Sequence, residues 1–265
     1  MNNRIFYFTG TGNSLAIARQ MAASLGGAEI TPMAAMPGGY VGQEEERIGL
    51  VFPVFAWGMP RMAAEFAKAL RPRTGQYVFA IATNGGSPGR TLVQLSKILR
   101  AIGSNLDGGF AVRGDFLISM QSQTEMALIK FIGWLGGKNV PGFAKDRFRE
   151  ISKTVEEKKS HGAETSNASL NFLGSLMYGF SIKMFARMDK GYSATDACVS
   201  CGACVRLCPR ENITLANGRP IWHQDCEYCF ACMAFCPQSA IAWKGAIPSD
   251  PKHHPDVTLS DVLLR

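Results

Sequence analysis

Cysteine is absent from most of this 265-residue chain, because all eight cysteines lie between Cys198 and Cys236. A disulfide framework needs an oxidising compartment and rarely spaces its cysteines three residues apart, so this concentration argues against one. A secretory leader is also missing, since Arg4 is followed by only four apolar residues, 5–8, and by no cleavage-type site. We therefore expect a cytoplasmic protein in the reducing cytosol of an anaerobe.

Long apolar runs are lacking as well. The longest, residues 170–182, is shorter than the roughly 18 residues of a spanning helix and is interrupted by two glycines. We expect no transmembrane segment. Extended to residue 188, the stretch predicts a helix packed between two domains, and contact with a membrane surface is the less favoured interpretation.

Two nucleotide-binding signatures fail. A P-loop needs a lysine before the serine or threonine that ends its glycine-rich turn, and residues 9–14 contain no lysine. The dinucleotide fingerprint needs three glycines, but Gly10 and Gly12 are followed by Leu15 at the third place. Neither a nucleoside triphosphate nor a nicotinamide cofactor is therefore expected.

Acidic residues are outnumbered. The chain has 28 Lys and Arg against 21 Asp and Glu, a net charge of +7. The excess is spread along the sequence without a basic run, which argues against nucleic acid as a partner. It fits an ordinary solvated surface and also suits an acidic redox protein as donor or acceptor, such as a ferredoxin or a reductase. The sequence predicts no oligomeric state.

The cysteines fall into two copies of one pattern. Residues 198–209 and 226–237 each spell C-x2-C-x2-C-x3-C-P. This run resembles the motif of bacterial ferredoxins with two [4Fe-4S] clusters, in which the fourth cysteine of each copy ligates the other cluster. Structural zinc is the rival interpretation, but zinc sites take two pairs rather than two quartets each closed by proline. The resemblance implies one cluster on Cys198, Cys201, Cys204 and Cys236, and another on Cys226, Cys229, Cys232 and Cys208.

The repeat extends beyond the cysteines. Ile213 and Ile241 occupy equivalent places after the two copies. Residues 213–215 and 220–222 flank a turn at Asn217-Gly218, which predicts a β-hairpin. We expect a small α+β ferredoxin domain here.

The chain begins with a short apolar run, residues 5–8, suited to a buried strand, and a helix is predicted from Leu15. The turn between them predicts a phosphate site, because backbone N–H groups and the positive end of the helix dipole face it. The alternative is a turn that only caps the helix. Its residues match the T-x-T-G-x-T/S loop of flavodoxins and are Thr9, Gly10, Thr11, Gly12, Asn13 and Ser14.

Further strand–loop–helix units follow, with buried strands at 48–55 and 77–82 and weaker ones near 28–32 and 109–113. Such alternation predicts an α/β doubly wound parallel sheet with its ligand at the carboxyl ends of the strands. The resemblance to the flavodoxin fold implies FMN, with its phosphate on the first loop and its ring between the next two. Trp57 as a plain core or lid aromatic and the third loop as a mere turn stay open. The ring site would comprise Pro53, Val54, Phe55, Trp57 and Gly58, then Thr83, Asn84, Gly85 and Gly86.

The middle and the end of the chain are less informative. A helix at 120–135 could lie in an insertion at 115–141, and an amphipathic helix is predicted at 145–159. His253 and His254 are expected to be exposed rather than metal ligands. The boundaries that we expect are a flavodoxin-like FMN-binding domain at 1–160, a helical linker at 161–189, the ferredoxin domain at 190–245 and a surface tail at 246–265.

This order of domains resembles the flavodoxin–ferredoxin fusion family of anaerobic bacteria and archaea. The resemblance implies an electron-transfer flavoprotein in which two [4Fe-4S] clusters and FMN couple one-electron donors to a two-electron acceptor, with no catalytic side chain. Two alternatives stay open. One is an FMN-dependent reductase of a small molecule bound over the flavin, and the other is an electron-transfer subunit of a larger redox complex.

Overall fold

A five-stranded parallel sheet forms the centre of the N-terminal unit. The computed structural model describes residues 2–114, 145–247 and 253–264. The strand order β2-β1-β3-β4-β5 is the flavodoxin-like order, so the predicted doubly wound fold is confirmed. All neighbours in this sheet pair in parallel. The strands are β1 (Asn3–Tyr7), β2 (Glu29–Pro32), β3 (Arg47–Pro53), β4 (Tyr77–Asn84) and β5 (Gly108–Arg113).

Helices cover both faces of the sheet. Strand residues alternate between the faces: Phe79 and Ile81 pack in the core with α1 and α5, while Val78 and Ala80 pack in the core with α2 and α3. Both cores are fully buried, which stabilises the unit by about 1.5–3 kcal/mol for each large apolar side chain. The helices are α1 (Asn13–Ser24), α2 (Arg61–Ala69), α3 (Thr91–Ala101) and α5 (Lys145–Glu156), and a short 3-10 turn, η1 (Met33–Ala35), follows β2.

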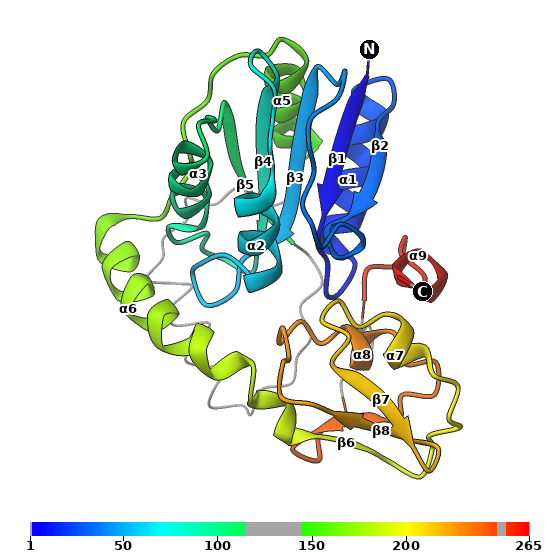
Figure 1. Cartoon of the computed structure of the whole chain (residues 1–265). Coiled ribbons are helices and arrows are strands. Elements are labelled where there is room, and N and C mark those ends of the chain that lie inside the picture. The colour runs from blue at the N-terminus through cyan, green and yellow to red at the C-terminus, as the bar shows by residue number, and fades with distance from the viewer. Residues whose placement is uncertain (1, 115–144, 248–252, 265) are drawn as a thin grey trace.

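The carboxyl ends of the strands point toward a smaller cysteine-rich unit, residues 190–247 (Figure 1). Its hairpin, β7 (Ile213–Ala216) with β8 (Arg219–Trp222), is the predicted one. A second antiparallel pair was not predicted from the sequence, and joins β6 (Tyr192–Ala194) to β9 (Ile241–Trp243). Two short helices, α7 (Ala203–Arg206) and α8 (Ala231–Ala234), begin at equivalent places in the two cysteine motifs.

The backbone of the two cysteine motifs repeats as closely as their sequences do. Positive φ angles occur at Ser200 and Gly202 in the first copy, and at Tyr228 and Phe230 in the second. These are the same two offsets from Cys198 and Cys226. Left-handed residues between ordinary ones turn successive N–H groups toward one concave side, an arrangement found at many iron–sulfur sites.

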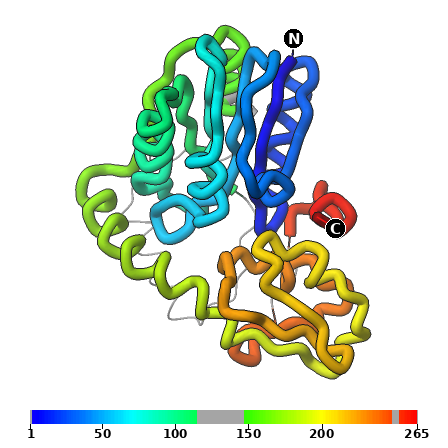
Figure 2. The backbone as a smooth tube through the Cα atoms, viewed as in Figure 1, coloured from blue at the N-terminus to red at the C-terminus, as the bar shows by residue number. Residues whose placement is uncertain are grey.

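Helix α6 (Ala168–Phe185) runs along one side of the molecule from the N-terminal unit to the 3-10 turn η2 (Met188–Gly191), as the tube in Figure 2 shows. The expectation of a helix packed between two domains holds for one face only. Leu170, Gly174 and Phe185 are buried. The outer face is exposed and carries Phe172, Leu173, Leu176, Met177, Phe180 and Met184. Within the described residues no helix is long and apolar enough to cross a membrane.

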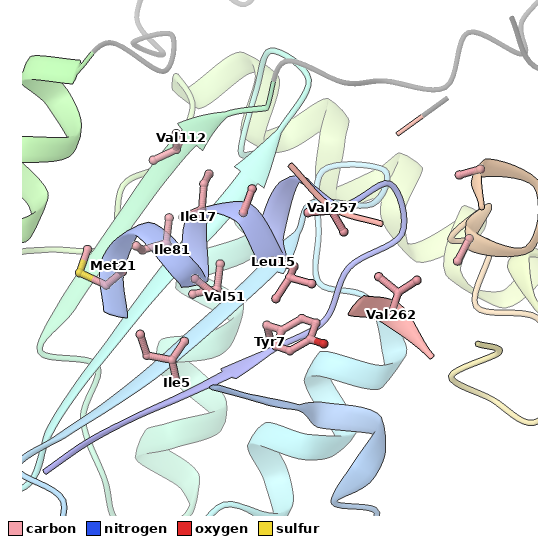
Figure 3. Packing of buried hydrophobic residues seen from close by; sticks show 14 of the residues in the cluster. Ile5, Tyr7, Leu15, Ile17, Met21, Val51, Ile81, Val112, Val257 and Val262 are labelled. Atoms are coloured by element: carbon pink, nitrogen blue, oxygen red, sulfur yellow. The ribbon is translucent and has the colours of Figure 1, made fainter. Parts of the chain in front are cut away.

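The C-terminal segment, residues 253–264, is more deeply packed than the predicted surface tail. Val257 is completely buried, and Figure 3 shows it with Val262 among side chains of β1 and α1. Helix α9 (Leu259–Val262) is held to α1 by an ion pair of 2.5 Å between Asp261 and Arg19. The two histidines are half-buried, contrary to expectation, and His253 stacks on Phe235 with ring centroids 4.4 Å apart. The helix expected at 120–135 lies outside the described residues.

Candidate functional site

The first predicted loop adopts a conformation suited to an anion. Gly12 has a φ of 94° and is the N-cap of α1, so it offers no side chain of its own to cap the helix. Both interpretations of the loop, a phosphate site and a turn that caps the helix, stay open. Within the loop, the Gly12 N–H donates to Thr9 Oγ1 and the Asn13 amide to Thr11 Oγ1, both at 3.0 Å. These bonds hold two hydroxyl groups at the positive end of the helix dipole.

The third loop is joined to the first by side chains. The Ser14 and Thr83 hydroxyls are 2.9 Å apart and buried, so the two predicted loops meet at the strand ends. Strand β4 extends further than expected and includes Thr83 and Asn84. The Asn84 side chain accepts a hydrogen bond from the Gly86 N–H at 3.0 Å, which shapes the turn. A Cβ added at Gly86 would meet nothing within 4 Å, while Gly85 is exposed.

The second loop is a tight, strained turn. Pro53 ends β3, and the Val54 N–H donates to the Thr83 carbonyl at 2.8 Å. Phe55 and Gly58 then exchange two backbone hydrogen bonds of 2.9 Å. The two residues between them, Ala56 and Trp57, have φ angles of 45° and 66°. Such a turn normally takes glycine or asparagine, so a tryptophan there costs on the order of 1–3 kcal/mol and marks the loop as a candidate functional site.

Helix α6 holds Trp57 in place by close approach. A Cβ at Gly174 would lie 2.7 Å from the Trp57 Cβ, so only glycine fits. One turn further on, the Tyr178 hydroxyl donates to the Met59 carbonyl at 2.8 Å and its ring covers Gly58. Trp57 is therefore packed between the loop and α6 and is half-buried rather than a core residue.

We expect Gly174→Ala to lower the thermal unfolding midpoint, because overpacking costs roughly 1–3 kcal/mol. Its matched control is Gly179→Ala in the same helix, where an added Cβ meets nothing within 4 Å. That control should stabilise by about 1 kcal/mol, since it removes a glycine from a helix interior. Differential scanning calorimetry under anaerobic conditions compares the two. Equal midpoints would contradict the close approach.

Four cysteines line one cavity in the cysteine-rich unit. We call Cys208, Cys226, Cys229 and Cys232 set two, and Cys198, Cys201, Cys204 and Cys236 set one. Tyr192 and Phe230 are among the other residues that line the set-two cavity. Cys208 thus comes from the first motif to join three cysteines of the second. All eight cysteines are free thiols.

The pKa shifts of the thiols follow this grouping in part, because the pKa of Cys232 of set two is raised by burial and also by Cys204 of set one. Burial raises the pKa of Cys226 to about 12, with Asp189 and the nearby Cys208 thiol adding to the shift and the Tyr228 N–H opposing it. Burial also raises the pKa of Cys229 well above its usual range, with Cys226 and Cys208 adding to the effect. In set one, burial raises the pKa of Cys204 to about 11, and Cys201 and Cys236 contribute. Any metal group bound here must displace thiol protons.

Hydrogen-bond donors lie close to several of these sulfur atoms. The Tyr228 N–H lies 3.2 Å from Cys226 Sγ, and the Ala240 N–H lies 3.3 Å from Cys236 Sγ. The buried Tyr192 hydroxyl and Trp222 indole N–H have no partner among the described residues, and both side chains line the set-two cavity. Buried donors of this kind need acceptors, and the sulfur atoms of a cluster are acceptors.

No three His, Cys, Asp or Glu side chains of the described ranges are grouped as ligands of one metal ion. A zinc site brings its thiolates to about 2.3 Å from a single ion. A four-iron cluster instead spreads four thiolates over four irons. The iron and zinc content of the purified protein separates the two donor arrangements.

The segment that carries Cys226 and Cys229, residues 225–230, also forms the contact between the N-terminal unit and the cysteine-rich unit. We call it the set-two segment. A Cβ added at Gly10 would overlap the carbonyl oxygen of Cys229. Tyr228 stacks on Phe185 with centroids 4.8 Å apart, and Phe185 makes an edge contact of 6.4 Å with Phe55 of the second loop. The cysteine-bearing loop therefore touches the first predicted flavin loop directly and the second through one aromatic ring.

An ionic cluster fixes this contact. Arg61 at the start of α2 lies 2.8 Å from both Asp225 Oδ1 and the Cys226 carbonyl. The buried Glu227 carboxylate accepts a hydrogen bond from the Met62 N–H at 3.1 Å, so it binds the N-terminus of α2. Burial raises the pKa of Glu227 to about 7, although the Met62 N–H and Arg61 oppose the shift. Arg210 bridges Asp225 and Glu65 from the other side.

We expect Arg61→Ala to lower the thermal midpoint, because loss of the cation leaves the buried Glu227 poorly compensated, at a cost of roughly 1–3 kcal/mol. The control is Arg219→Ala, which removes an exposed ion pair of 3.3 Å with Asp196. Exposed pairs contribute about 0–1 kcal/mol. Should both variants unfold at the same temperature, the ionic cluster would not hold the units together.

Sequence reasoning missed the residues that join the two units. Arg61, Glu227 and Phe185 belong to no motif, and no pattern pairs residues so far apart. The His254 N–H donates to the Thr11 carbonyl at 2.8 Å, which brings the C-terminal segment onto the first loop. The available signal was the apolar end of the tail, where Val257, Leu259, Val262, Leu263 and Leu264 follow a stretch rich in proline and charge.

Comparisons with known proteins agree in fold class only. No protein family and no curated protein matches the sequence of this chain. Among solved structures, a flavodoxin from Streptococcus pneumonia TIGR4 is 11% identical, with 60% of this chain and 99% of that chain covered and a TM-score of 0.39. Rubredoxin oxygen:oxidoreductase from Desulfovibrio gigas is 15% identical over 59% of this chain and 35% of its own, with a TM-score of 0.37. An azoreductase from Bacillus anthracis str. Sterne is 10% identical over 59% and 100%, with a TM-score of 0.36.

Proposed function

We propose that the chain is an electron-transfer flavoprotein that binds FMN at the three loops and one [4Fe-4S] cluster on each cysteine set. When bound, these groups supply one-electron transfer at the clusters and one- or two-electron transfer at the flavin. The observation that carries the proposal is the contact between Gly10 and Cys229. It sets the predicted phosphate loop against the wall of a cysteine-lined cavity.

Each part of the chain has a definite task in this proposal. The first loop and the N-terminus of α1 bind the phosphate, with the hydroxyls of Thr9 and Thr11 as further donors. The strained turn presents Trp57 beside the flavin ring, and the third loop approaches the ring with bare backbone at Gly85 and Gly86. The C-terminal segment covers the first loop, because a Cβ at Gly12 would lie 3.0 Å from His254 and Val257 side chains. It thereby excludes water from the phosphate.

The cysteine-rich unit holds its sulfurs in fixed places. Backbone N–H groups at residues 228 and 240 donate to thiolates, which lowers the energy of the negative sulfur atoms. The ring of Phe230 and the unpartnered hydroxyl of Tyr192 close the set-two cavity. Together they keep this cavity largely dry and confine the redox centre to the side that faces the flavin loops.

The proposal predicts a preference for one-electron donors. Because the chain has no recognisable nicotinamide-binding unit, we expect NADH or NADPH alone to reduce the protein slowly or not at all. A reduced ferredoxin or a low-potential dye should bleach both chromophores quickly in anaerobic stopped-flow experiments. With an acidic ferredoxin the rate should fall as salt rises, since screening acts over about 10 Å.

A second candidate function is an FMN-dependent reductase of a small molecule. The open space beside Gly86 favours it, because a ligand could lie over the third loop there. In both candidates the clusters feed electrons to the flavin, so NADH alone should be a poor reductant of either one. Fast, stoichiometric flavin reduction by NADH without a second protein would identify a pyridine-nucleotide oxidoreductase instead of a relay.

A further inference from the structure

The two cysteine sets differ in what surrounds them. The set-two segment, residues 225–230, is covered by α2, α6 and the first loop through the contacts described above. Two members of set two, Cys208 and Cys232, are buried, and Cys226 and Cys229 are half-buried. In set one, Cys201 is exposed and the other three thiols are half-buried. Set one is therefore the more exposed of the two sets.

The exposed edge around Cys201 has its own composition. Its loop is held against the β-hairpin at the far end of the molecule from the sheet (Figure 1): an added Cβ at Gly202 would lie 3.9 Å from Leu215, and one at Gly218 2.8 Å from Ser200 Oγ. Val199 is 62% exposed, and Leu215 is also exposed. The edge thus offers a small apolar surface directly beside a ligand of set one.

We propose that this edge, centred on Val199, Cys201 and Leu215, is the docking site of an acidic electron-carrier protein, and that set one is the entrance and set two the internal relay. The inference rests on the proposed function. Apolar contact at a rim with few charges lets a carrier approach closely, and the net charge of +7 on the chain attracts an acidic one. Each docked carrier gives up one electron and leaves oxidised, so two carriers must dock in turn for each two-electron reduction.

Accessibility tests the order of the sets without any turnover. In the reduced holoprotein a soluble dysprosium chelate broadens the EPR signal of whichever cluster lies nearer to solvent. Cys201→Ser and Cys208→Ser assign the two signals. We expect the set-one signal to broaden strongly and the set-two signal to change little. Equal broadening, or stronger broadening of set two, would overturn the inference and leave the proposed function standing.

Docking is tested with a matched pair of variants. Val199→Glu places a carboxylate on the proposed edge, and Val41→Glu does so at a valine that is 59% exposed on the N-terminal unit. With a dithionite-reduced, acidic ferredoxin that carries a single cluster as probe, we expect Val199→Glu to slow bimolecular reduction roughly tenfold through like-charge repulsion and lost contact. Val41→Glu should have little effect, and reduction by dithionite itself should be equal in all three proteins.

Two results would count against the docking site. If Val199→Glu and Val41→Glu slow the ferredoxin equally, only overall charge matters and the edge is not the entrance. If Val199→Glu slows the ferredoxin no more than it slows dithionite, a small anion that needs no docking surface, the edge is not the entrance. Anaerobically purified protein that contains no iron would overturn the proposed function, and with it this inference.

Discussion

Cys208→Ser should remove the cluster of the second motif and spare that of the first. Cys208 lies in the first motif, but its thiol shares a cavity with Cys226, Cys229 and Cys232. We expect iron to fall from roughly eight to roughly four atoms per chain. Serine keeps the size of the side chain but is a poor ligand for iron, so the loss follows from chemistry rather than from packing.

Cys236→Ser is the reciprocal experiment. In addition to burial, the Cys201 and Cys236 thiols both raise the pKa of the Cys204 thiol, so both lie near Cys204. Loss of Cys236 should therefore remove the cluster on set one and leave the one on set two. EPR spectra of the two reduced variants should each retain one signal, and the retained signals should differ. If Cys208→Ser instead perturbed the signal that depends on Cys201, each motif would bind its own cluster and the crossed grouping would be wrong.

Gly10→Ala should be strongly destabilising. The added Cβ would overlap the Cys229 carbonyl, and a backbone atom on each side leaves no flexible side chain to move aside. We expect the substitution to lower the free energy of unfolding by roughly 3 kcal/mol, the upper end of the range for overpacking. The contact between the two units should open at this point. We expect a lower thermal midpoint, slower flavin reduction by dithionite-reduced clusters, and an unchanged iron content.

Gly38→Ala provides the comparison. An added Cβ at Gly38 meets nothing within 4 Å and its backbone has no positive φ, so the substitution should be neutral. Flavin reduction as fast in Gly10→Ala as in Gly38→Ala would mean that the contact between the first loop and Cys229 is not part of the electron path.

The fold could be predicted because its signals are local. The strand residues 48–53 and 77–82 are continuous apolar runs, and such runs are typical of strands covered on both faces. Both strands lie at the centre of the sheet as expected. The pair β6–β9 was missed because each strand has only three residues and the partners are far apart in sequence.

The candidate site could be predicted where the spacing of residues along the sequence defines a motif. The cysteine motifs and the Thr9–Ser14 turn have fixed patterns, because a cluster or a phosphate needs particular atoms at particular intervals. The left-handed conformation of Trp57 has no such pattern, because it results from the packing of α6. Glu227 and Met62 interact across 165 residues, and nothing in either local sequence indicates the other.

Long-range packing also explains the corrected expectations. The tail was predicted to lie on the surface from its prolines, yet two buried valines, Val257 and Val262, and the Arg19–Asp261 ion pair anchor it to α1. The helix at 168–185 was predicted to be packed between domains from its apolar composition. Composition does not distinguish a helix buried on every side from one that, like α6, is buried along a single stripe.

The central claim is that one chain binds both kinds of redox group, and cofactor content tests it most directly. The measurement is the number of iron atoms and of flavin molecules per chain in a single anaerobically purified sample, with the released flavin identified by chromatography. The account predicts roughly eight iron atoms and one FMN. Zinc in place of iron, or iron without any flavin, would contradict it.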